Sequence, residues 1–159
     1  MLALADSRYL RFGAFAGLYF AQGIPWGLFF AAMPTWLASE GYSSTQVGTF
    51  IGVVTLPWTF KLLTGPLMDR FSFLPMGRRR PWVIVAQLGI VLGSLAMAFV
   101  GTGFWILLAA CAFVNFCAAW QDVAVDGMAM DVLEEDERAR ANAFMFGGQA
   151  VGAAASTFG

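Results

Sequence analysis

Long apolar runs separated by short polar segments dominate the sequence. Four runs are long enough to cross a bilayer as helices: 12–37, 47–68, 82–100 and 104–130. At helical rise the first would be ~39 Å long, so we expect it to tilt or to bend at Pro25 and Pro34. A fifth run, 141–159, is rich in Gly and Ala and ends without a flanking anchor, as if the chain were cut inside a helix. The pattern predicts an all-α membrane protein with about five transmembrane helices.

Local signals mark helix ends and contacts. Ser43 with Gln46 fits a capping box at the start of the second helix. Glycines four residues apart indicate close approach of neighbouring helices; the pairs are Gly13/Gly17, Gly23/Gly27 and Gly89/Gly93. The charged connector 131–140 contains Glu134/Arg138 and Asp136/Arg140 at i,i+4 spacing, which predicts a solvated helical turn.

Composition agrees with a membrane location. The chain is 59% hydrophobic and 12% charged, whereas soluble proteins carry about 25% charged residues. A net charge of −1 argues against a nucleic-acid partner, and the lack of histidine excludes histidine-based catalysis and histidine metal sites. Cys111 and Cys117 fit no motif and are interpreted as buried apolar residues. Nothing in the sequence indicates a metal ion or a cofactor.

If the four apolar runs cross the membrane one after another, all the arginines fall on one side of it. They are Arg8, Arg11, Arg70, Arg78, Arg79, Arg80, Arg138 and Arg140. The opposite connections, 39–46 and 101–103, contain no Lys or Arg. By the positive-inside rule, the N-terminus and the connections after the second and fourth helices are expected in the cytoplasm.

Three ionisable residues fall inside the apolar runs. Each ionised carboxylate near mid-membrane costs ~2.5–3.5 kcal/mol on insertion scales, so Asp122 and Asp126 should be paired or used. Lys61 lies eight residues before Asp69, and Asp122 lies nine before Asp131. Lys61 and Asp122 are therefore at matched depth, ~12 Å inside, and an ion pair between them is expected. In the alternative, Lys61 snorkels to the interface and Asp122 faces a water-filled cavity.

A polar stripe follows the same face of the fourth helix. Asp126 stands about 40° from Asp122 and Asn115 about 20° from it, and the small residues Ala118, Ala119 and Ala129 complete the stripe. A stripe of this kind lines an aqueous path or admits a neighbouring helix; with two carboxylates in it, we favour the path. Gln121 beside it is a further candidate for the cavity wall.

The first helix offers a second candidate surface. Tyr19, Gln22, Gly23 and Trp26 share one face, which could stack against and hydrogen-bond a polar substrate. The alternative is that this aromatic face only packs against other helices.

The connection after the second helix carries a specific motif. It reads Gly65-Pro66-Leu67-Met68-Asp69-Arg70 and, after a spacer, Gly77-Arg78-Arg79-Arg80. This resembles the signature loop of the major facilitator superfamily, although the spacer 71–76 is longer than the common form. The long spacer, Phe60-Lys61-Leu62 and the motif 121–127 together resemble one branch, the AmpG-type muropeptide permeases and acetyl-coenzyme A transporters.

The resemblance implies a twelve-helix transporter of two six-helix bundles with substrate between them, of which this chain would be the N-terminal part without the C-terminal bundle. It implies that helices one and four face the central cavity. It also implies a gating role for the loop residues: Gly65, Asp69, Arg70, Gly77, Arg78, Arg79 and Arg80. Asp69 would contact a helix N-terminus of the missing half in one access state.

We therefore expect a secondary active transporter working by alternating access, proton-coupled, in the bacterial cytoplasmic (inner) membrane. Its cargo would be a polar or amphiphilic solute, muropeptide-like or acyl-nucleotide-like, and its other partners the lipid bilayer and protons. Lys61, Asp122 and Asp126 are the candidates for proton coupling, and Tyr19, Gln22, Trp26, Asn115 and Gln121 are the candidates for the cavity or substrate site. The alternative is a non-transporting membrane protein that assembles another complex. An enzyme ranks third, because no nucleophile–base pair is visible.

Overall fold

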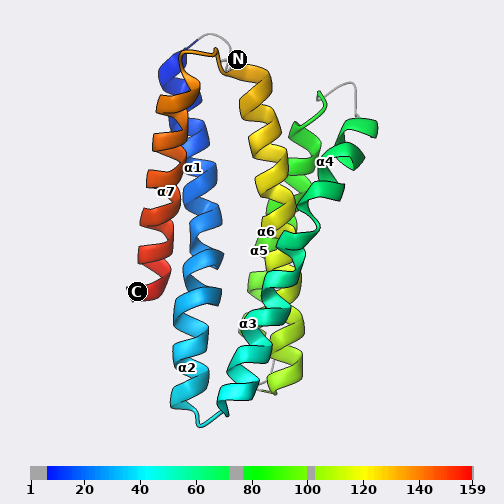
Figure 1. The fold of residues 1–159 in the computed structure, drawn as a ribbon, viewed down its shortest axis with the longest axis vertical. Coiled ribbons are helices and arrows are strands. Elements are labelled where there is room, and N and C mark those ends of the chain that lie inside the picture. Colours follow the sequence, from blue (N-terminus) through cyan, green and yellow to red (C-terminus); the bar gives the residue numbers. More distant parts are fainter. Residues whose placement is uncertain (1–6, 72–76, 100–102, 159) are drawn as a thin grey trace.

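The computed structural model describes residues 7–71, 77–99 and 103–158, and these fold into helices joined by short turns (Figure 1). The elements are α1 (Arg8–Gly27), η2 (Leu28–Ala32), α2 (Met33–Ser39), α3 (Ser44–Thr59), α4 (Lys61–Arg70), α5 (Arg80–Phe99), α6 (Phe104–Val132) and α7 (Arg138–Phe158). The spacer residues 72–76 and the turn residues 101 and 102 lie outside the described residues.

Four stretches of the described chain are long and apolar enough to cross a membrane: Arg8–Ser39, Ser44–Arg70, Arg80–Phe99 and Phe104–Val132. They overlap the first four predicted spans, with ends that differ by up to four residues. Residues 141–158 of the fifth predicted segment fall within α7, which is 21 residues long and is not among these four. The all-α membrane fold expected from the sequence is thus confirmed.

The first span is one continuous helix with a wide turn in the middle. Pro25 lies inside α1, and the π-helical segment η2 begins three residues later. Proline lacks an N–H and its ring crowds the carbonyl four residues earlier. For Pro34, in the first turn of α2, that carbonyl belongs to Phe30 inside η2, so the wide turn accommodates this proline. A bend near both prolines was expected, and the structure has its irregular turn between them.

The second span is broken, which the sequence did not predict. The capping box of Ser43 and Gln46 is present, and α3 begins at Ser44. The helix ends at Thr59, and Phe60 leaves helical geometry with φ −87° and ψ 1° before α4 begins at Lys61. Pro57 removes a hydrogen bond in the last turn of α3, which weakens the helix at this point. Lys61 consequently begins a new helix instead of lying in the middle of one.

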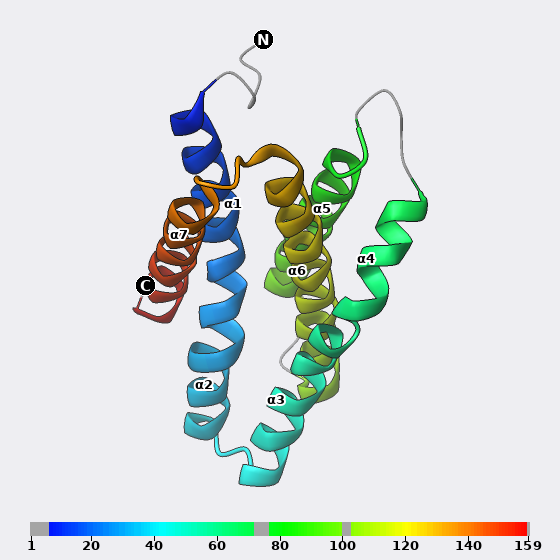
Figure 2. The ribbon, with the colours of Figure 1, turned by 45° about the horizontal axis from the view of Figure 1, so that its top comes forward.

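The helices form two groups. In Figure 1, α7 runs beside α1, while α3 and α4 lie with α5 and α6. Figure 2 shows α4 leaning away from α6 toward the end that carries the signature loop. Contacts of α6 with α1, and of α3 with α2 and η2, join the two groups. α6 and α3 are therefore elements through which the groups touch.

Glycines make the α1–α7 contact unusually close. A Cβ built on Gly23 would collide with the carbonyl of Gln149, and one on Gly27 with the carbonyl of Ala153. The arrangement is reciprocal, because Cβ atoms on Gly148 and Gly152 would meet backbone atoms of α1. The pair Gly23/Gly27 thus serves the close packing that its spacing predicted.

Two apolar clusters fill the interior, one above the other along the helices. The cluster at the signature-loop end includes Phe15, Met68 and Val125, and the cluster at the opposite end includes Phe50 and Leu108. Between them along α1, α4 and α6 lie Gln22, Lys61 and Asp122, and Tyr19 and Asp126 lie one turn further on, beside residues of the first cluster. We call these five residues the polar layer, and the candidate site lies there.

The glycine contacts lead to a first prediction. Gly152→Ala should destabilise the fold by ~1–3 kcal/mol, because the methyl group meets backbone that cannot swing aside. Gly13→Ala is the matched control: nothing lies within 4 Å of its Cβ position, and removing a helical glycine should be neutral or stabilise by up to about 1 kcal/mol. Thermal unfolding in detergent measures both. Equal melting temperatures for the two variants would contradict the close α1–α7 contact.

Candidate functional site

An ion pair occupies the centre of the polar layer. Lys61 Nζ of α4 contacts Asp122 Oδ2 of α6. The Asp122 side chain is 7% exposed, and that of Lys61 is 32% exposed. The ammonium group also lies 4.2 Å from the ring centroid of Trp58, a cation–π contact. The pair expected from matched depth is present, and it neutralises a carboxylate that would be costly to bury alone.

The first helix supplies two more partners to the carboxylates of α6. Gln22 Nε2 donates to Asp122 Oδ1 at 2.5 Å, and the hydroxyl of Tyr19 donates to Asp126 Oδ1. Gln22 is 1% exposed and its Oε1 has no partner among the described residues. Asp122 is thus held by two helices at once, while Asp126, on the exposed side, has one donor.

The remaining sequence candidates have structural contacts of their own. Asn115 Nδ2 donates to the Val54 carbonyl, in the turn of α3 that Pro57 disturbs. Gln121 Nε2 donates to the Leu18 carbonyl at 3.2 Å, adding another link between α6 and α1. Trp26 is 39% exposed.

The two faces predicted from the sequence, on α6 and on α1, are only partly present in the structure. Asn115, Ala118 and Ala119 are at most 2% exposed and pack between helices. This part of the stripe therefore makes helix contacts, which was the alternative to lining an aqueous path. On α1, Tyr19 and Gln22 face α6, whereas Gly23 contacts α7. Trp26 lies against Trp58, with ring centroids 5.2 Å apart. The exposed groups at the layer are therefore Asp126, Lys61 and Trp26.

The signature motif forms a charged cluster at one end of the bundle. Arg79 Nη2 lies 2.6 Å from Asp69 Oδ1, and its Nε lies 3.8 Å from Asp131 Oδ2. The guanidinium lies flat against Gly127, where a Cβ would come within 2.6 Å of Arg79 Cζ. Only a glycine leaves room for this contact. Arg79 thus joins α4 to the end of α6.

Other members of the motif are not in the cluster. Arg70, Arg78 and Arg80 are exposed and have no ion pair among the described residues. Gly77 has φ +82°, which an L side chain rarely adopts, so the turn before Arg78 requires glycine. Nothing lies within 4 Å of the Cβ position of Gly65.

A second buried ion pair escaped the sequence analysis. Arg11 of α1 donates from Nε to Glu137 Oε2 at 3.0 Å and from Nη2 to Oε1 at 2.7 Å, and both side chains are 7% exposed. This bidentate contact lowers the pKa of Glu137 below its ordinary value of 4.5. The turn expected in the connector is present before α7, but neither Glu134 with Arg138 nor Asp136 with Arg140 forms an ion pair among the described residues. No signal in the sequence linked residues 126 positions apart.

Two carboxylates one helical turn apart have different surroundings: one is neutralised by a lysine, and the other meets a phenol at an exposed edge. No group of three or more potential metal ligands occurs in the described part of the chain. Cys111 and Cys117 are buried and unbonded.

Helices of this length with ionisable residues paired between them define a multi-pass integral membrane protein. The family model of the major facilitator superfamily matches residues 15–158, and the chain belongs to that family. The signature loop and the polar layer are therefore parts of a transporter family's fold, which agrees with the resemblance found in the sequence.

The relatives place the chain within this family. It is 34% identical over 123 residues to the anhydromuropeptide permease of Escherichia coli, covering 76% of this chain and 25% of the relative. It is 31% identical over 149 residues to an uncharacterised membrane protein of Saccharomyces cerevisiae, covering 75% of this chain and 26% of that protein. The chain thus spans about a quarter of the length of these relatives. No solved structure matches.

The Lys61–Asp122 contact leads to a second prediction. Lys61→Met or Asp122→Asn alone leaves a buried charge unpaired, which costs ~3–5 kcal/mol when burial is complete and less here because Lys61 is partly exposed. The double variant should lose less than the sum of the single variants. Folded yield in membranes and thermal stability in detergent measure the effect. Additive losses would mean that the two charges do not stabilise each other.

The Arg11–Glu137 contact leads to a third prediction, on pH. Because the folded-state pKa of Glu137 is depressed, its contribution to stability is present above the ordinary value and is lost as pH falls through the lower folded-state pKa. Glu137→Gln should lower the melting temperature at pH 7, and the difference from wild type should shrink below about pH 4.5. Glu135→Gln, an exposed neighbour, is the control and should show no such change. A gap that stays constant down to pH 3 would exclude this ionic contribution.

Proposed function

We propose that this chain forms the first helices of a secondary active transporter that moves a polar or amphiphilic solute by alternating access, coupled to protons. The observation that carries the proposal is the polar layer of α1, α4 and α6. A membrane protein has little reason to keep Lys61 and Asp122 between two apolar clusters, with Asp126 one helical turn away, unless they act in transport.

The two carboxylates have different roles in this proposal. Asp122 is paired with Lys61 and accepts from the amide of Gln22, and it positions α4 against α1. Asp126 is the proton carrier, because it is exposed and has a single donor, the Tyr19 hydroxyl. Protonation of Asp126 removes a negative charge beside Asp122 and changes the bond that joins α6 to α1.

The cargo we propose is muropeptide-like. Support comes from the relative named an anhydromuropeptide permease and from the chemistry of the layer. Trp26, 39% exposed, presents an aromatic face for a sugar ring, and Lys61, 32% exposed, presents a cation. A solute carrying sugar and carboxylate groups would find a partner for each of them.

The orientation belongs to the same proposal. The signature-loop end carries Asp69, Arg70 and the Arg78–Arg80 run, so we place it and the N-terminus in the cytoplasm of a bacterial inner membrane. In this orientation Asp126 lies on the cytoplasmic side of Asp122. A proton released from Asp126 would enter the cytoplasm together with the solute.

The fourth prediction tests coupling in the full-length protein reconstituted in vesicles, with a radiolabelled anhydromuropeptide as the solute. Asp126→Asn should abolish accumulation driven by a pH gradient and leave downhill exchange measurable, because the solute site remains while the titrating group is lost. Asp136→Asn, an exposed acid of the connector, is the control and should accumulate solute normally. Accumulation by Asp126→Asn at the wild-type level would show that another group carries the proton.

A further inference from the structure

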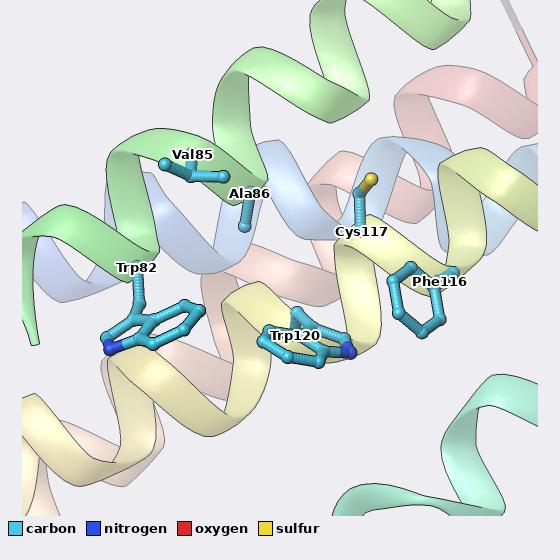
Figure 3. A pocket seen from close by; sticks show the side chains of 6 residues that line it. All are labelled: Trp82, Val85, Ala86, Phe116, Cys117 and Trp120. Carbon is cyan, nitrogen blue, oxygen red and sulfur yellow. The ribbon is translucent and has the colours of Figure 1, made fainter. Parts of the chain in front are cut away.

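An apolar pocket of about 270 Å³ lies between α5 and α6, away from the polar layer. Figure 3 shows Trp82 from α5 and Trp120 and Phe116 from α6 along one side of it, with Val85 and Ala86 on the facing turn of α5. The rings of Trp82 and Trp120 lie 5.4 Å apart. The lining contains no charged residue, so the pocket cannot share the chemistry of the proposed transport site.

The pocket opens on the outer surface of two membrane-spanning helices. Val85 is 64% exposed and Phe116 is 42% exposed, and both belong to stretches that can cross a bilayer. Its volume falls just below the ~300–1,000 Å³ of pockets that enclose whole small molecules. It suits a slender apolar chain better than a bulky polar solute.

The pocket adjoins the basic end of the bundle. Trp82 Nε1 donates to the carbonyl of Phe71, 3.2 Å away, which ties the pocket to the residue after Arg70. Arg78 and Arg80 immediately precede Trp82 in the chain. Arg79 is engaged by Asp69, whereas Arg70, Arg78 and Arg80 are exposed and have no ion pair among the described residues. Three exposed arginines thus lie close in sequence to Phe71 and Trp82, the two residues that this hydrogen bond joins.

We propose that this pocket is a binding site for an anionic phospholipid. An acyl chain lies between Trp82 and Trp120, and the phosphate is bound by Arg78 and Arg80, with Arg70 nearby. Basic groups between transmembrane helices at the cytoplasmic face are suited to acidic head groups, and tryptophan is favoured at the membrane interface. Since leaving bulk lipid for an apolar pocket gives an acyl chain little gain, the arginines must supply the preference for negative charge.

The consequence of the site is a link between lipid charge and the signature loop. A phosphate held by Arg78 and Arg80 would anchor the start of α5, next to the Arg79 that joins Asp69 to Asp131. The contacts of Arg79 with Asp69 and Asp131 would then be more stable in an anionic leaflet and less stable in a neutral one. This inference does not depend on the identity of the transported solute.

The test uses the full-length protein in phosphatidylcholine vesicles that contain a phospholipid with brominated acyl chains. Bromine quenches tryptophan fluorescence on contact, so the head group of the brominated lipid can be varied alone. Brominated phosphatidylglycerol should quench more than brominated phosphatidylcholine. Arg78→Gln with Arg80→Gln should raise the half-saturating fraction of phosphatidylglycerol by about five-fold for each arginine.

Two further variants separate the pocket from a general attraction to negative membranes. Trp82→Phe with Trp120→Phe should lose the extra quenching by phosphatidylglycerol, because the reporters are gone while the other tryptophans remain. Arg140→Gln, an exposed arginine at the start of α7, should leave half-saturation unchanged. Equal quenching by the two lipids, an undiminished excess in the Trp82/Trp120 variant, or the same shift for Arg140→Gln would each overturn the proposal.

Discussion

A charge in a low-dielectric interior must have a partner, and the architecture of this chain depends on how that requirement is met for Asp122. Lys61 and Gln22 reach the carboxylate from two different helices. Removing either would cost more than the lost contact, because the remaining charge would be left in the membrane interior. Helices α1, α4 and α6 therefore meet at one level, between the two apolar clusters.

The same requirement explains why the ion pair could be anticipated from the sequence. Helical rise is regular, so depth can be counted from any residue whose position is known. The two reference residues, Asp69 and Asp131, prove to be bound by one arginine, Arg79, at 2.6 and 3.8 Å. They share a common level, and counting inward from each leads to Lys61 and Asp122. Helical rise does not show which residues are buried by other helices. Asn115 and Ala118 lie against other helices instead of along an open path.

The fold was predictable wherever a single segment determined the outcome. Apolar length sets the four spans, and the capping box of Ser43 and Gln46 sets the start of α3. The break at Phe60 was not predictable, because Pro57 weakens a helix without specifying where it ends or resumes. The Arg11–Glu137 pair was missed for a different reason: each residue, taken alone, has the appearance of a solvated charge at a helix end. Contacts between residues that are far apart in the sequence become evident only in the folded structure.

Adjacent residues of α6 bring the polar layer and the signature loop within one helical turn. The carboxylate of Asp126 accepts from Tyr19 on α1, while the next residue, Gly127, lies under the guanidinium of Arg79. Since α6 continues as one helix from Phe104 to Val132, a shift of its backbone at Asp126 also displaces the surface on which Arg79 rests. Arg79 in turn holds Asp69 at the end of α4. Asp126 is thus linked to Asp69 by a chain of direct contacts that runs through the backbone of α6 and the Arg79 side chain.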